Sequence, residues 1–164
     1  MNKPMLLIIL LVCLLIAGCG EETRYRMLGG YITQPISGPI DIGKEWVEIV
    51  PPKPLKGLGS YIVVKAKGLD EGPDMYRSVK FPDGSVGKIE ARLYDDKGQV
   101  VDFDCYTLEI TNIKILHIWK KGTRLGENVP IPGFPHDTRF VKAQIRSDVQ
   151  LHCDSIEWEG YSSK

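Results

Sequence analysis

Apolar and polar residues alternate with a period of two along much of this chain. In Lys88–Tyr94, Ile89, Ala91 and Leu93 share one side, while the residues between them are charged. This alternation is typical of a β-strand with one face in a core. The segments expected to form strands are Trp46–Val50, Tyr61–Ala66, Lys88–Tyr94, the run up to Phe103, Tyr106–Ile110, Ile113–Trp119, Arg139–Ile145 and Val149–Trp158.

Two local signals refine this pattern. Asp95–Gly98 predicts a turn in which Gly98 takes a positive φ, so Lys88–Phe103 is expected to form a β-hairpin. In Val149–Trp158 the apolar phase slips, because Cys153 lies in one phase and Ile156 in the other. That slip predicts a β-bulge near Asp154.

The pattern predicts an all-β fold. A sustained 3.6-residue repeat is missing after the leader, so we expect few or no helices there. Short strands separated by Gly and Pro turns indicate a β-sandwich, with immunoglobulin-like and jelly-roll or C2-like topologies both open. One helical turn could form around Asp74–Ser78. Arg146–Asp148 is expected to make a turn that pairs the last two strands.

The amino terminus follows a different pattern. Lys3 precedes an uninterrupted apolar run, Met5–Ile16, and small residues then lead into Cys19. A helix of about twelve residues spans roughly 18 Å, which is short of the ~30 Å hydrocarbon core of a bilayer. A cleaved signal sequence therefore fits better than a transmembrane anchor.

The segment Ile16-Ala17-Gly18-Cys19 resembles the lipobox of bacterial lipoproteins. The resemblance covers only the leader. It implies cleavage before Cys19, a diacylglycerol on its thiol, and fatty chains such as palmitate on the new amino group. Residues 1–18 would then be the signal peptide, 19–30 a lipidated flexible tether, and 31–164 one β-sandwich domain. An ordinary secretory signal with a chance cysteine is the alternative.

This resemblance also bears on localisation. Two or more acyl chains hold a protein stably on a membrane. The expected location is therefore the extracytoplasmic side of the cell membrane or of the outer membrane. Gly20 stands where an Asp would favour inner-membrane retention in the enterobacterial version of the class, so the outer membrane is favoured in a bacterium with two membranes.

Charge limits the set of partners. The chain has 21 basic and 21 acidic residues. A balanced chain without a basic patch is not expected to bind nucleic acid. It also lacks a polybasic segment that would assist the lipid at the membrane.

Two cysteines remain in the mature domain. Cys105 and Cys153 both lie in strand-like segments, and extracytoplasmic compartments permit oxidation. A Cys105–Cys153 disulfide is therefore the prediction, with two free thiols as the alternative.

Candidate catalytic groups are sparse. His117, His136 and His152 fit no metal-binding spacing, so no metal or cofactor is expected. Asp102 and Asp104 would share one strand face, where they could bind calcium or act as acid and base, although a solvated outer face is the simpler interpretation. Asp70, Glu71 and Asp74 crowd one loop without a calcium-loop spacing.

Aromatic residues are the better candidates for binding. Trp119 lies near the end of a predicted strand, and Tyr161 follows the last one, so either could contact a ligand. Trp158, in phase with Ile156, is expected in the core.

These observations favour a non-catalytic, membrane-anchored binding or scaffold module of the cell envelope, with an envelope protein as its partner. A carbohydrate-binding domain that uses Trp119 and Tyr161 is the alternative. A small hydrolase that uses His136 or the Asp102/Asp104 pair is the third hypothesis.

Overall fold

The computed structural model describes residues 30–74, 76–110, 114–123, 134–135 and 137–162. The chain divides into two compact units, Met1–Ile32 with Tyr161–Lys164, and Thr33–Gly160. In the first unit only residues 30–32 and 161–162 are described, and they are the ends of two strands. The core and the sites described below belong to the second unit.

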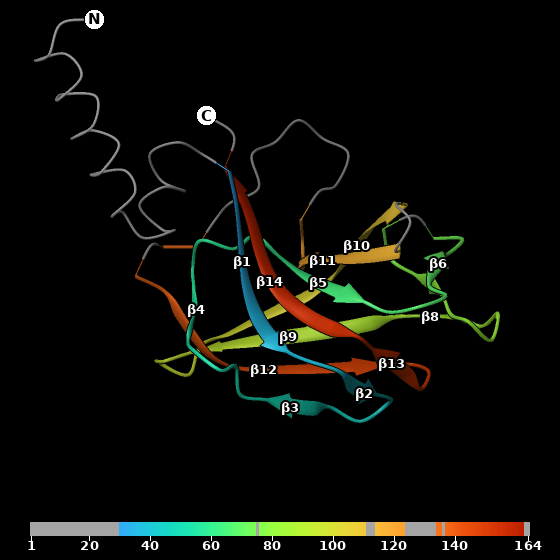
Figure 1. The fold of residues 1–164 in the computed structure, drawn as a ribbon, viewed down its shortest axis with the longest axis horizontal. Helices are drawn as coiled ribbons and strands as arrows, with labels where there is room; N and C mark the ends of the chain where they lie inside the picture. The colour runs from blue at the N-terminus through green and yellow to red at the C-terminus, as the bar shows by residue number, and fades with distance from the viewer. Residues whose placement is uncertain (1–29, 75, 111–113, 124–133, 136, 163–164) are drawn as a thin grey trace, which may run out of the picture. The chain divides into compact units, whose positions relative to one another are not determined.

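Antiparallel strands build the second unit (Figure 1). They are β1 (Gly30–Ser37), β2 (Ile40–Ile42), β3 (Val47–Ile49), β4 (Leu55–Lys56), β5 (Tyr61–Lys65), β6 (Asp70–Glu71), β7 (Val79–Lys80), β8 (Val86–Gly87), β9 (Ile89–Asp95), β10 (Val100–Ile110), β11 (Lys114–Lys120), β12 (Arg139–Ser147), β13 (Leu151–Cys153) and β14 (Ser155–Ser162). Within the described ranges there is no helix. The all-β prediction is confirmed.

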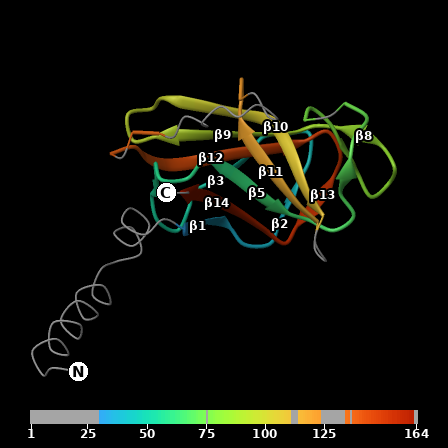
Figure 2. The same ribbon diagram turned by 90° about the horizontal axis from the view of Figure 1, so that it is seen from above.

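The main sheet runs in the order β1-β14-β5-β11-β10-β9-β12-β3, with β4 also paired to β12. It curves into a nearly closed, barrel-like layer around the core (Figure 2). Two small sheets accompany it, β13-β2 and β6-β7-β8. The sandwich-like class is therefore confirmed, with its two faces joined in one continuous sheet.

The core forms from the side chains that alternation predicts to point inward. In β9, Ile89 and Leu93 are fully buried. Trp158, also fully buried, lies among three phenylalanines, with ring centroids 5.8 Å from Phe103, 5.6 Å from Phe134 and 5.7 Å from Phe140. Burial of such large apolar side chains is the main favourable contribution to folding.

The predicted β9–β10 hairpin is confirmed. Val100–Phe103 pairs with Ala91–Tyr94 in antiparallel register. The Gly98 N–H donates to the Asp95 carbonyl at 3.1 Å, and Gly98 has a φ of 79°, a left-handed conformation that glycine adopts without steric cost.

The phase slip at Asp154 has a different cause from the predicted bulge. Leu151–Cys153 pairs with β2 in a small sheet, whereas Ser155–Glu159 pairs with β5 in the main sheet. Asp154 separates the two strands, and its N–H donates to the Lys65 carbonyl at 2.7 Å. The chain thus changes sheets at the residue where the apolar phase changes.

The predicted pairing of the last two strands is wrong. β12 pairs with β9, β3 and β4, while β13 pairs with β2 and β14 pairs with β5. Instead, the turn after Ser147 forms hydrogen bonds with a segment that is distant in the sequence. The Asp148 N–H donates to the Lys88 carbonyl, and the Asp148 carboxylate accepts from the Lys88 N–H at 2.9 Å.

Candidate functional site

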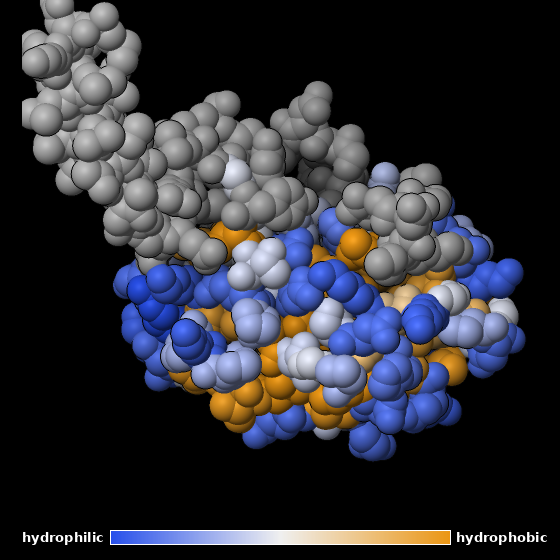
Figure 3. All heavy atoms as spheres, viewed as in Figure 1, coloured by the Kyte–Doolittle hydropathy of each residue, from blue (hydrophilic) through white to orange (hydrophobic). Residues whose placement is uncertain are grey.

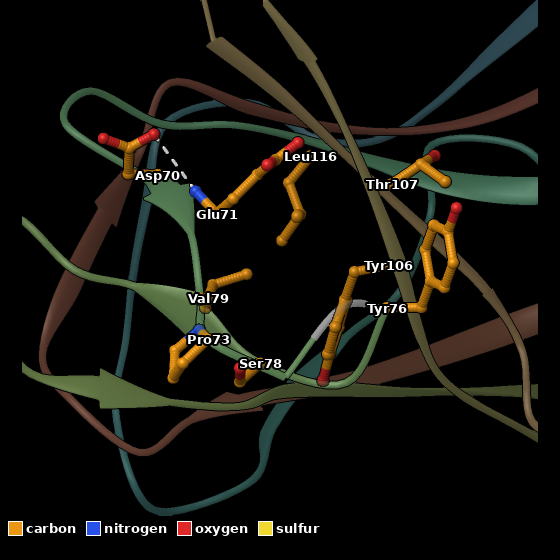
Figure 4. A pocket seen from close by; sticks show the side chains of 10 residues that line it. Asp70, Glu71, Pro73, Tyr76, Ser78, Val79, Tyr106, Thr107 and Leu116 are labelled. Carbon is orange, nitrogen blue, oxygen red and sulfur yellow. Dashed lines mark hydrogen bonds between the residues drawn. The ribbon is translucent and has the colours of Figure 1, made fainter.

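A cavity of about 330 Å³ lies between the β6-β7 pair and strands β10 and β11. Figure 4 shows the side chains around it. Its lining residues are Asp70, Glu71, Gly72, Pro73, Tyr76, Ser78, Val79, Tyr106, Thr107 and Leu116. Cavities of this size suit a small organic ligand. This cavity is the candidate ligand pocket.

Apolar and aromatic side chains form the inner part of the ligand pocket. Leu116 and Val79 are almost fully buried, and Tyr106 is 3% exposed. The Tyr106 hydroxyl accepts from the Ile89 N–H at 3.1 Å and donates to the Ile89 carbonyl. Because burial disfavours the phenolate, the pKa of Tyr106 is raised well above its usual range. The Tyr106 hydroxyl is therefore already bonded, and only a small part of the side chain is exposed to the pocket.

Two carboxylates lie at the ligand pocket, and they point in different directions. The Asp70 carboxylate accepts from the Glu71 N–H at 3.1 Å and lies away from the cavity (Figure 4). The Glu71 side chain extends toward Leu116 in the same view. Both residues are exposed, and the residues that line the pocket include no Lys, Arg or His. Lys80 lies opposite Asp70 in the β6–β7 pair, so the acidic side chains at the mouth have a basic neighbour.

The loop that closes one side of the ligand pocket is tightly hydrogen-bonded. The Ser78 N–H donates to the Asp74 carbonyl at 3.1 Å, and the Asp74 N–H donates to Ser78 Oγ at 3.1 Å. This i to i+4 bond lies where one helical turn was expected. Tyr76, inside the loop, has a φ of 68°, which is uncommon for a residue with a side chain. Its carbonyl accepts from the Tyr106 N–H at 3.0 Å, which fixes the loop to the main sheet.

Strain of this kind persists where the surrounding structure holds it in place, and it occurs often at ligand sites. Sequence reasoning missed this pocket. The available signal was the crowding of Asp70, Glu71 and Asp74 in one loop, which matched no metal-binding spacing.

The two predicted ligand-contact aromatics stand apart from this pocket. Trp119 Nε1 donates to Thr107 Oγ1 at 3.0 Å, and its ring tilts against Tyr61 with centroids 4.5 Å apart. Trp119 is half-buried and does not line the pocket. The side chain of Tyr161 lies outside the described residues, as does Cys19.

Asp102 and Asp104 both line one small hollow of about 60 Å³, and the candidate histidines that the structure describes do not join them there. Asp102 forms an ion pair with Arg92 at 3.0 Å, and Asp104 lies 3.9 Å from Lys121. His117 stacks on Tyr61 with ring centroids 4.8 Å apart. These residues lie on the main sheet.

His152, by contrast, lies on the small β13-β2 sheet, exposed as expected, with Nδ1 2.7 Å from Asp41. His136 falls outside the described residues. Among the residues that are described, no three His, Cys, Asp or Glu side chains are grouped as metal ligands would be.

The predicted disulfide is absent, and Cys105 and Cys153 are both free thiols. The sheet register explains this result. Cys105 pairs with Trp119, Trp119 with Tyr61, and Tyr61 with Glu159, so Cys105 is level with Glu159. Ser155, the first residue of β14, lies roughly 13 Å before Glu159 at about 3.3 Å per residue, and Cys153 precedes it in β13, which belongs to another sheet. A disulfide needs Cα atoms within about 7 Å.

The two thiols also differ in environment. The β10 register shifts between Phe103 and Cys105, so Cys105 turns away from the core. It lines a groove of about 520 Å³ with Asp104, Arg77 and Lys121. Desolvation and the nearby Asp104 raise the pKa of Cys105. Burial raises the pKa of Cys153 to about 12.

The surface is mixed in character. On the face shown in Figure 3, apolar and polar residues are interspersed. The large apolar side chains that are exposed in the described parts of the chain lie on separate elements, and they are Val50, Val86, Val100 and Val141. They form no continuous apolar stripe along one strand.

None of the described residues belongs to a helix with the length and hydropathy needed to span a membrane. Comparisons with models of protein families, with curated proteins and with solved structures find no match to this chain.

Proposed function

We propose that this protein is a lipid-anchored, extracytoplasmic binding module without catalytic activity, and that it holds a small ligand in the pocket between β6-β7 and β10-β11. The lipobox-like segment ending at Cys19 supports the anchor. The β-domain would then be held at the membrane surface by acyl chains. The outer membrane is the proposed location in a bacterium with two membranes, because Gly20 follows Cys19.

The observation that carries the binding function is the ligand pocket itself. It combines a buried apolar interior, a preformed rim and a few polar groups, which is the usual composition of small-molecule sites. The carboxylates once considered for catalysis, Asp102 and Asp104, lie outside this pocket beside Arg92 and Lys121. A binding role therefore fits the geometry better than hydrolysis.

Fewer structural observations support the carbohydrate-binding function and the envelope-protein partner. A sugar ring needs an open aromatic face, whereas Trp119 is half-buried against Tyr61. An envelope-protein partner stays a prediction of the sequence, and it is compatible with a ligand in the pocket.

The anchor is tested by expressing the full chain in a bacterium and comparing it with Cys19→Ala. The unaltered protein should partition into detergent and carry the mass of acyl chains after signal cleavage. Cys19→Ala should lose that mass and the partitioning. Cys13→Ala is the matched control, because Cys13 leaves with the leader and its replacement should change neither. An unmodified Cys19 thiol would refute the anchor.

The ligand pocket is tested by ligand-observed NMR with a library of small, fragment-sized molecules and the full-length protein in detergent. Pro73 lines the pocket and is exposed, so Pro73→Trp should block it without unfolding the domain. We expect binding of the hits to weaken at least tenfold in Pro73→Trp. Pro52→Trp, an exposed position outside the pocket, should leave binding unchanged. Hits that bind both variants equally would contradict a binding role for this pocket.

A further inference from the structure

We propose that the preferred ligand of this pocket is a small neutral compound with hydroxyl groups, such as a polyol. This inference rests on the proposed binding function and adds the chemical class of the ligand. Three polar side chains that line the ligand pocket carry it: the hydroxyls of Thr107 and Tyr76 and the carboxylate of Glu71.

Thr107 offers the ligand pocket a hydrogen-bond donor. Its Oγ1 accepts from Trp119 Nε1 at 3.0 Å, so the hydroxyl is held in place while its own proton stays available. Among the described residues, no side chain or carbonyl accepts that proton. A ligand with an acceptor group can therefore take the place of water at Thr107.

Tyr76 supplies a second hydroxyl from a different element. The Tyr76 carbonyl accepts from the Tyr106 N–H at 3.0 Å, and the Asp74–Ser78 bonds hold the loop around it. Within the described part of the chain, the Tyr76 hydroxyl has no hydrogen-bond partner. Because the fold fixes the backbone of this loop before a ligand arrives, the cost of binding is lowered.

Glu71 supplies the acceptor. Its carboxylate forms no ion pair or hydrogen bond with any residue that the structure describes, whereas Asp70 has an interaction of its own and lies opposite Lys80 in the β6-β7 pair. In Figure 4 Glu71 extends from β6, and Thr107 and Tyr76 lie to its right. The ligand pocket therefore presents two donors and one acceptor from three separate segments.

Hydroxyl groups match this set, because each of them both donates and accepts. An ammonium group only donates, so it would reach Glu71 and leave the Thr107 and Tyr76 protons without an acceptor. A ketone or a carboxylate only accepts, so it would leave Glu71 without a donor. Polar groups that lose water without gaining a partner weaken a complex.

The apolar part of the ligand pocket leaves this choice to the hydrogen bonds. Leu116, Val79 and Tyr106 are 0%, 1% and 3% exposed, so they offer a ligand only a small contact area. A cavity of about 330 Å³ accommodates a six-membered ring with its substituents. We therefore expect affinity to follow the polar groups of the ligand.

The test uses probes that share a six-membered carbon ring: trans-1,2-cyclohexanediol, the neutral acceptor cyclohexanone, cyclohexylamine, which is a cation at pH 7, and the anion cyclohexanecarboxylate. Their affinities for the full-length protein in detergent are measured by NMR titration, with the signals of Thr107 and Leu116 locating the site. We expect the diol to bind at least tenfold more tightly than each of the other probes.

Glu71→Ala should lower the affinity for the diol at least fivefold and leave that for cyclohexanone within twofold, because only the diol donates to this carboxylate. Glu71 is exposed, so the substitution should not disturb folding. Glu45→Ala, at an exposed acid outside the pocket, is the matched control and should change neither affinity. Equal binding of the diol to Glu71→Ala and to the unaltered protein would overturn the role of Glu71.

Tyr76→Phe should weaken the diol and cyclohexanone alike, at least threefold, because both accept from the lost hydroxyl. Tyr94→Phe is the control, since the Tyr94 hydroxyl donates to Gln144 Oε1 at 2.7 Å and lies outside the pocket. Unchanged affinities in Tyr76→Phe would remove this hydroxyl from the site.

The remaining outcomes separate this inference from the proposed function. If cyclohexanone, cyclohexylamine or cyclohexanecarboxylate binds at the ligand pocket as tightly as the diol, the hydroxyl inference fails and the binding function stands. The same holds if none of these probes shifts the signals of Thr107 or Leu116 while molecules of the fragment library do. If neither the probes nor the library shifts them, both fail.

Discussion

Gly59 shows how closely backbone and side chain approach in this core. A Cβ built on Gly59 would lie 2.0 Å from Trp158 Cε2 and 2.1 Å from its Nε1. The Trp158 indole cannot move easily, because it is fully buried and its Nε1 donates to the Lys56 carbonyl at 2.7 Å. The indole can therefore pack in this position only because residue 59 has no side chain.

Gly59→Ala should lower the free energy of unfolding by about 3 kcal/mol, because the added methyl group overpacks the core around Trp158. Urea denaturation followed by tryptophan fluorescence measures this change. Gly38→Ala is the control, since a Cβ at Gly38 meets nothing within 4 Å, and its effect should stay within about 0.5 kcal/mol. Equal denaturation midpoints for the two variants would show that the packing around Trp158 is looser than described.

The cysteines give a second prediction at the scale of single residues. In the folded protein, a maleimide should modify Cys105 faster than Cys153, because Cys105 is half-exposed in its groove and Cys153 is fully buried. Peptide mass mapping after timed labelling gives both rates. Unfolding should make the two thiols react alike. Recovery of a peptide in which a disulfide joins Cys105 to Cys153 would show that the two thiols are not free.

At the scale of elements, the β9–β10 hairpin depends on one carboxylate. Asp95 Oδ1 accepts from the Lys97 N–H at 2.9 Å and from the Gln99 N–H at 2.7 Å. These two bonds satisfy backbone donors that the turn leaves without a strand partner. A short polar side chain at this position is therefore part of the turn.

Asp95→Ala should destabilise the protein by about 1–2 kcal/mol, because both turn donors lose their acceptor. Thermal or urea unfolding provides the measurement. The neighbouring Asp96 is exposed, so Asp96→Ala should change stability by no more than about 0.5 kcal/mol. Equal losses for the two alanine variants would refute the role assigned to Asp95.

Sequence reasoning worked for elements long enough to show a period. β5, β9, β11 and β12 begin and end within about one or two residues of the predicted segments. β9 alternates between buried and half-buried residues, whereas β5 is an apolar run buried on both faces. β2, β4, β6, β7 and β8 have only two or three residues each, too few to display an alternation. β1 was also missed; it contains Pro35, which an edge strand tolerates.

The β10 bulge was missed for a related reason. Val101, Phe103 and Cys105 alternate regularly in the sequence, and this alternation alone would place Cys105 on the same face as Phe103. In the structure Phe103 and Tyr106 are both buried, and the register shift between Phe103 and Cys105 accommodates them. The available signal for the bulge was that Phe103 and Tyr106 are both large and aromatic, although the alternation places them on opposite faces of the strand.

The ligand pocket could not have been predicted, because its walls come from residues between 70 and 79, from 106 and 107, and from 116. Only the pairing of β10 with β11 and the placement of the β6-β7-β8 sheet bring these residues together. Local composition carries no information on such contacts.

At the scale of the whole molecule, the free energy of unfolding should fall as the pH rises above about 9. Folding raises the pKa of Cys153 to about 12 and the pKa of Tyr106 still higher, so these groups keep their protons in the folded state. Their unfolded counterparts lose protons near pH 8.5 and 10. Because the unfolded chain then binds fewer protons, stability decreases with pH.

Urea titrations between pH 7 and pH 11 test this expectation. Tyr106→Phe should be less stable at pH 7 by about 1–3 kcal/mol, since Ile89 loses its buried hydrogen-bond partner. The same variant should show a shallower decline above pH 10. An identical decline in the variant and the unaltered protein would exclude Tyr106 as a source of the alkaline effect.

The strand order has a further consequence for biogenesis. β14, near the carboxyl terminus, is inserted between β1 and β5, two strands from the amino-terminal half of the chain. Trp158, which the phenylalanines surround, also arrives with that last strand. The sheet therefore cannot close between β1 and β5 until β14 has been synthesised. Contacts between segments so far apart in the chain form slowly, because long loops must close before the pairing stabilises them.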